Sequence, residues 1–102
     1  MTTKQRLEVY TNALVTFGER TQMVVALEEL AECQKEVCKY MRGYGNAEHM
    51  AEEIADAWIC LEQLRYFLGL DDLVRKKMDQ KIKRLDRTLR VEAYGGDAYG
   101  QA

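Results

Sequence analysis

Apolar residues recur at spacings of three and four along most of the chain, and this spacing predicts amphipathic α-helices. The helices are expected at about residues 3–17, 21–42, 47–68 and 71–90. Glycines interrupt the pattern between these segments, at Gly18, Gly43, Gly45 and Gly69. Short connections between helices favour antiparallel neighbours. The pattern therefore predicts an all-α fold, an antiparallel four-helix bundle over residues 1–90.

Each predicted helix carries an apolar stripe that we expect to face the core. In the second helix the stripe is Met23, Leu27, Leu30, Gln34, Val37 and Met41, and in the fourth it is Val74, Met78, Ile82, Leu85 and Leu89. The third segment, 47–68, is apolar around most of its circumference. Such a helix must be central or shared with a second subunit, so we expect oligomerisation to complete the bundle.

Residues 91–102 contain the repeated triplet Ala-Tyr-Gly and have no helical period. This composition predicts a flexible C-terminal tail. The alternative is an aromatic flap over the site of a neighbouring subunit.

Composition narrows the class of protein. The chain has 102 residues, with a hydrophobic fraction of 47%, a charged fraction of 31%, no proline and a net charge of -2. A nearly neutral chain has no global field to attract nucleic acid or an anionic membrane, so neither partner is expected. The three cysteines form no C-x-x-C pair, which predicts a reduced, cytoplasmic protein. No apolar run suggests a signal peptide or a membrane helix.

Two acidic pairs lie at helical spacing in adjacent predicted helices. Glu29 and Glu32 form an E-x-x-E pair, and Glu53 and Asp56 form an E-x-x-D pair. Residues three apart project to one side of a helix, and the turn between the helices places the two pairs level within about one helical turn. Four carboxylates in one volume repel one another unless a cation neutralises them. Hard oxygen ligands suit Mg²⁺, with Mn²⁺ as a possible substitute.

The alternative for these acids is an ordinary solvated helix face. Their neighbours favour a site, because Val25 and Cys33 lie four residues either side of Glu29, and Ala57 and Cys60 follow Glu53 on the next helix. An exposed acidic face rarely has apolar residues along the same ridge.

The fourth predicted helix has a basic outer face. Lys77, Lys81 and Arg84 recur at spacings of four and three. They suit the binding of phosphate oxygens, although a solvated basic face is an equal alternative.

The order of these features resembles the all-α nucleoside triphosphate pyrophosphohydrolases of the MazG-like superfamily. The similar features are Gln22, the E-x-x-E pair, the E-x-x-D pair after 20 intervening residues, and the basic helix at 77–84, and the similarity covers about residues 17–87. The resemblance implies that the four acids bind Mg²⁺, which holds the triphosphate, and that water attacks at the α to β linkage. The resemblance further implies that the products are a nucleoside monophosphate and pyrophosphate, as in nucleotide pool clean-up, and that the assembly is a homodimer or homotetramer. Relatives often carry an asparagine near a lysine in the last helix, and this contact does not transfer to Lys77-Met78-Asp79-Gln80-Lys81.

Several further residues have more than one interpretation. Gln22 matches a nucleotide-contacting position in some relatives or supports the helix end, and His49 is a ligand, a base or a rim residue. Trp58 and Tyr66 stack on a base or belong to the core. A carboxylate outside the ligand set would accept the proton of the attacking water. The candidates for this base are Glu28, Glu36 and Glu52.

Other functions remain open from the sequence. A non-catalytic helical oligomerisation or adaptor module would need no metal, and a nucleic-acid binder would use the basic helix. Among enzymes, phosphoribosyl-ATP pyrophosphohydrolases and dimeric dUTPases resemble this chain in the same way, through an acidic site.

Overall fold

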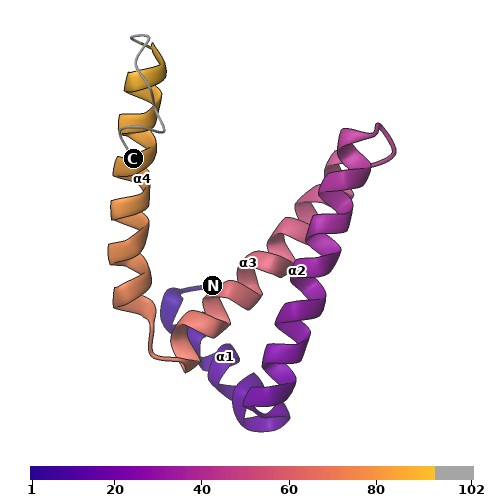
Figure 1. The fold of residues 1–102 in the computed structure, drawn as a ribbon. Coiled ribbons are helices and arrows are strands. Elements are labelled where there is room, and N and C mark those ends of the chain that lie inside the picture. Colours follow the sequence, from indigo (N-terminus) through magenta and orange to yellow (C-terminus); the bar gives the residue numbers. More distant parts are fainter. Residues whose placement is uncertain (94–102) are drawn as a thin grey trace. The chain divides into compact units, whose positions relative to one another are not determined.

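The computed structural model describes residues 1–93, which form four α-helices and no strand. The helices are α1 (Thr3–Phe17), α2 (Glu19–Met41), α3 (Ala47–Phe67) and α4 (Asp71–Ala93) (Figure 1). The predicted all-α fold class is therefore confirmed.

Two helix ends differ by more than one residue from the sequence-based expectation. α2 begins at Glu19 rather than Thr21, because Gly18, with a φ of 87°, both ends α1 and precedes α2 without a linker. α4 continues to Ala93 rather than Arg90. The first residues of the predicted tail are thus helical, and the rest of it, 94–102, lies outside the described residues.

Local hydrogen bonds set the start of two helices. The Thr2 side chain accepts from the Gln5 backbone N–H, and the Gln5 side chain accepts from the Thr2 N–H, which forms a capping box at α1. The Asn46 side chain accepts from the His49 N–H at 2.8 Å and starts α3 after the turn. The turn lets α3 run back along α2.

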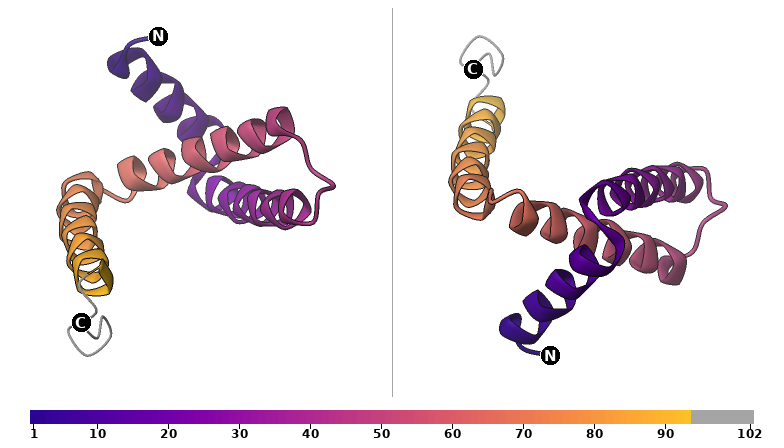
Figure 2. Two further views of the ribbon diagram at one scale, coloured as in Figure 1. Left: turned by 90° about the horizontal axis from the view of Figure 1, so that it is seen from above. Right: turned by 90° about the horizontal axis from the view of Figure 1, so that it is seen from below.

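The chain divides into two compact units, Met1–Gly69 and Leu70–Ala102. In the first unit, α2 and α3 lie side by side as an antiparallel hairpin, and α1 packs against both (Figures 1 and 2). In the second unit, α4 carries ion pairs at i,i+4 spacing along its surface. These pairs are Arg75–Asp71, Lys83–Asp79 and Arg90–Asp86.

Small residues form the contact between α2 and α3. The buried apolar side chains of the described residues are Ala26, Ala57 and Cys60. At a point nearer the open end of the hairpin, Gln63 Nε2 donates to Gln22 Oε1 at 3.0 Å. The side of α2 that faces α3 therefore carries small and polar residues.

The prediction that the apolar stripe of α2 faces the core is wrong. Leu27 is 69% exposed and Met41 is 81% exposed. α2 instead turns toward α3 the side that carries Gln22, Ala26 and Glu29, because small and polar side chains let the two helices approach closely. The apolar stripe of α4 is also exposed, with Ile82, Leu85 and Leu89 each more than half accessible.

Among the described helices, none combines the length and the apolar character that crossing a membrane requires.

Candidate functional site

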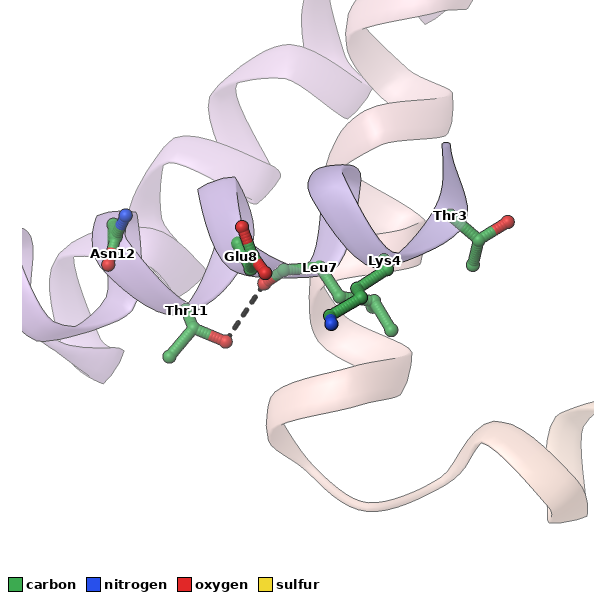
Figure 3. A pocket seen from close by; sticks show the side chains of 6 residues that line it. All are labelled: Thr3, Lys4, Leu7, Glu8, Thr11 and Asn12. Atoms are coloured by element: carbon green, nitrogen blue, oxygen red, sulfur yellow. Dashed lines mark hydrogen bonds between the residues drawn. The ribbon is translucent and has the colours of Figure 1, made fainter. Parts of the chain in front are cut away.

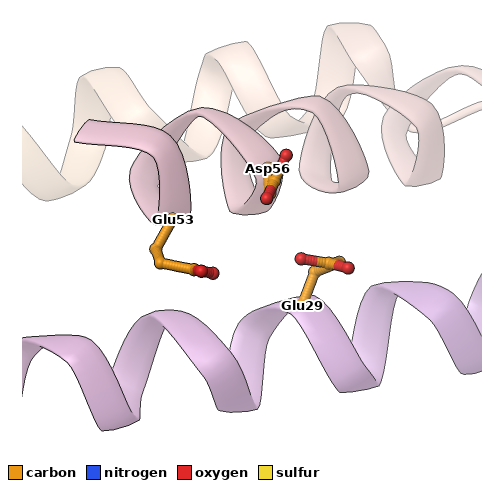
Figure 4. A group of neighbouring side chains, drawn as sticks. All are labelled: Glu29, Glu53 and Asp56. Carbon is orange, nitrogen blue, oxygen red and sulfur yellow. The ribbon is translucent and has the colours of Figure 1, made fainter. Parts of the chain in front are cut away.

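Three of the four predicted acids meet between α2 and α3. Glu29 projects from α2, and Glu53 and Asp56 project from α3 toward it (Figure 4). One carboxylate oxygen from each residue lies within 4.8 Å of the other two. The i,i+3 spacing on α3 places two ligands on one side, and the antiparallel hairpin brings the third opposite them.

Two of these three acids are partly withdrawn from solvent. Glu29 and Glu53 are partly buried, and Asp56 is exposed. The Oε2 atom of Glu53 is buried and has no hydrogen-bond partner within the described part of the chain. A buried, unpaired carboxylate oxygen is costly. Hard oxygen donors of this kind match the ligands that Mg²⁺ prefers.

The electrostatic environment of the cluster is strongly negative. Burial raises the pKa of Glu29, and the charges of Asp56, Glu53, Glu32 and Glu28 raise it further, in that order of size. Burial also raises the pKa of the Cys60 thiol, with smaller contributions from Glu29 and Asp56. Both shifts mean that the site favours added positive charge, whether from a proton or from a metal ion.

Glu32, the fourth predicted ligand, lies outside this group of three. It is exposed on α2, one turn beyond Glu29, and acts on Glu29 through its charge. Its role as a ligand stays a prediction.

Gln22 lies on the same side of α2, about two turns before Glu29. Its side-chain carbonyl accepts the hydrogen bond from Gln63. Gln22 therefore supports the contact between α2 and α3. Its contact with a nucleotide stays a prediction.

The predicted phosphate-binding residues lie on α4, in the second unit, where all three are exposed. Lys77, Lys81 and Arg84 form no ion pair with any residue of the described chain, whereas Arg75, Lys83 and Arg90 are paired along α4. These three charged groups are therefore accessible to a ligand.

The three candidate bases differ in their exposure to solvent. Glu28 and Glu52 are exposed, whereas Glu36 is 8% exposed and is the one buried charged residue among those described. Glu36 lies seven residues after Glu29 on nearly the same side of α2, about 10 Å along the axis. The sequence-based prediction did not distinguish Glu36 from the other two candidates, although this spacing could have indicated its burial. His49 is exposed at the start of α3.

A hollow along α1 has different properties. Its volume is about 730 Å³, and Figure 3 labels the side chains that line it: Thr3, Lys4, Leu7, Glu8, Thr11 and Asn12. All of them come from one helix, and the Thr11 hydroxyl already donates to the Leu7 carbonyl at 2.9 Å. No group of acids converges there, so the carboxylates between α2 and α3 remain the candidate site.

Comparison with known proteins gives no relative: no protein-family model, no curated protein and no solved structure matches this chain.

Proposed function

We propose that this chain is a Mg²⁺-dependent nucleoside triphosphate pyrophosphohydrolase, which cleaves a (deoxy)nucleoside triphosphate to the monophosphate and pyrophosphate. The observation that carries the proposal is the meeting of Glu29, Glu53 and Asp56 from two helices within 4.8 Å. The order of the acidic pairs, which resembles the MazG-like enzymes, supports the same reaction.

In this proposal the three carboxylates hold Mg²⁺, and Glu32 supplies a fourth at the exposed rim. When bound, Mg²⁺ neutralises the charge of the triphosphate and lowers the pKa of bound water. The chain's own part is to fix the carboxylates on two packed helices, so that little reorganisation is needed when substrate binds. No side chain has to act as a nucleophile.

Phosphate oxygens are the proposed ligands of Lys77, Lys81 and Arg84. The support is their chemistry and their lack of an acidic partner along α4. A lysine or arginine without an internal partner is available for charge-assisted hydrogen bonds to phosphate.

A homo-oligomer, a dimer or a tetramer, is part of the proposal. The exposed apolar residues of α1 and α3, Val9 and Trp58 among them, support it. Large apolar side chains at this density on a monomer mark an interaction surface.

The experiment is product analysis. The protein is incubated with Mg²⁺ and a panel of canonical and modified nucleoside triphosphates, and the products are identified by phosphorus NMR. We expect a monophosphate and pyrophosphate in equal amounts, and no reaction in excess chelator. Release of inorganic phosphate, or hydrolysis that is insensitive to the chelator, would contradict the proposed chemistry.

A non-catalytic helical module is the second candidate, and the same exposed apolar residues favour it. Such a module gains nothing from metal. Equal melting temperatures with and without Mg²⁺, together with an unreactive nucleotide panel, would support this function instead.

A further inference from the structure

An apolar groove lies between α1 and α3, within the first unit. Its volume is about 780 Å³, and its apolar walls include Val9 from α1 and Ile54, Trp58 and Ile59 from α3. All four side chains are exposed, and Trp58, the largest, is 61% exposed. A tryptophan left this accessible in a concave apolar surface is typical of a binding surface rather than of a finished core.

A polar group in the lining of the groove fixes the tryptophan. The Glu62 carboxylate accepts hydrogen bonds from Tyr10 Oη, from Trp58 Nε1 at 3.1 Å and from Arg6 Nη1 at 3.2 Å. The bonds from Tyr10 and Arg6 orient the Glu62 carboxylate, and this carboxylate holds the indole through the bond from Trp58 Nε1. A side chain that is ordered before binding loses less conformational entropy when a partner covers it.

The first unit needs more buried surface than it has. The buried apolar residues of the described chain are Ala26, Ala57 and Cys60, all of them small. A small domain with so few buried side chains gains stability when association covers its apolar residues.

We propose that a second copy of this chain covers the α1–α3 groove and that Trp58 is the anchor of this interface. The inference rests on the homo-oligomer of the proposed function and is independent of the hydrolytic reaction. Standard interfaces bury about 800 Å² on each partner around an aromatic or apolar centre. The Trp58 patch supplies such a centre.

The charges of the groove fit self-association. A symmetric dimer pairs one patch with itself, so a patch of a single sign repels its copy. Here the charged residues of the groove are Arg6 and Glu62, one of each sign and already paired. Two such patches meet without net repulsion, whereas the basic surface of α4 would repel its own copy.

The geometry keeps the groove away from the carboxylates. Trp58 follows Asp56 by two residues, so the two side chains leave α3 about 200° apart around its axis. An interface at Trp58 therefore supports α3 from one side and leaves the carboxylate side open to substrate.

The test uses the intrinsic fluorescence of the full-length protein, because Trp58 is the only tryptophan. Emission maximum and acrylamide quenching are measured over a dilution series without nucleotide or metal, and mass is followed by sedimentation velocity. We expect Trp58 to be shielded in the assembly and to become accessible on dilution, with the same midpoint as dissociation. Shielding that persists after the assembly has dissociated would overturn the proposal, since another segment of the same chain would then cover the groove. An assembled protein with an accessible Trp58 would overturn it as well.

Two variants locate the interface. Trp58→Glu should shift the assembly to a smaller species, whereas Leu27→Glu, at an exposed position on α2, should leave the shielding of Trp58 unchanged. Circular dichroism checks that both variants stay helical. If Trp58→Glu proves unfolded, the dilution series on the wild-type protein still decides the matter.

Discussion

Glu29 and Asp56 are separated by 26 residues in the chain, yet their carboxylates lie within 4.8 Å of each other in the folded hairpin, with that of Glu53 beside them. Unfolding separates these groups, because they come from different helices. A cation that needs all three therefore binds the folded chain in preference to the unfolded chain.

Mg²⁺ should raise the melting temperature. A ligand at 100 times its dissociation constant stabilises the folded state by about 2.7 kcal/mol. For a domain of this size that corresponds to a shift on the order of 10 °C. Differential scanning calorimetry with Mg²⁺ and with chelator measures the shift. An identical melting temperature in both buffers would rule out a cation bound at this cluster.

Removing one charge of the cluster should separate metal binding from stability. Asp56→Asn lowers the like-charge repulsion, so the metal-free protein should melt no lower than wild type while its response to Mg²⁺ is lost. Glu32→Gln should reduce the response less, since Glu32 lies outside the group of three. Glu8→Gln, at an exposed position on α1, is the matched control and should change little. A full Mg²⁺ response in Asp56→Asn would contradict the assignment.

Ionisation of the Tyr10 hydroxyl should lower the free energy of unfolding at high pH. Burial and the hydrogen bond to Glu62 raise the pKa of Tyr10 to about 12. Because the folded-state pKa is above the ordinary value near 10, the stabilisation is complete below pH 10 and is lost as the pH rises toward 12. Tyr10→Phe should lose about 1–2 kcal/mol at neutral pH and lack this loss between pH 10 and 12. Denaturant melts at several pH values, with a spectrophotometric titration of the phenol, test both parts. A Tyr10 that titrates near 10 would refute the contact.

The turn between α2 and α3 should not tolerate a side chain at Gly45. A Cβ there would lie 3.1 Å from the backbone N and Cα of Tyr40 and 3.3 Å from Glu36 Oε1. The backbone of Tyr40 is part of α2 and cannot move aside easily. Gly45→Ala should cost about 1–3 kcal/mol in urea melts, by overpacking. Wild-type stability in this variant would mean that the turn is looser than described.

Periodicity predicted the helices well, because each helix depends on local spacing and caps. Helix ends at Gly18 and around Asn46 followed from turn and cap chemistry within a few residues of the chain. The face of α2 that meets α3 did not follow, because a stripe of leucine and methionine looks like a core stripe in one chain even when it remains exposed. Only the folded hairpin identifies the stripe of Ala26 and Glu29 as the contact side.

The candidate site was partly predictable for the same reason. Spacing placed Glu53 and Asp56 on one side of a helix, and an antiparallel turn placed Glu29 opposite. The rotation of α2 about its own axis decides whether Glu29 or Glu32 points inward, and that rotation depends on packing with α3. Two of the three donors to Glu62, Arg6 and Tyr10, lie more than fifty positions before it in the chain, so no local pattern could indicate these hydrogen bonds.

The most direct test is the rate of Mg²⁺-dependent pyrophosphate release by the wild-type protein, by Glu53→Gln and by Lys76→Gln, an exposed basic control on α4. Loss of a metal ligand costs several kcal/mol of transition-state stabilisation, so Glu53→Gln should fall by about 100-fold or more. The rate of Lys76→Gln should remain close to the wild-type rate, and chelator should stop the reaction of both these proteins. Undiminished pyrophosphate release by a folded Glu53→Gln variant would contradict the carboxylate centre as the site of hydrolysis.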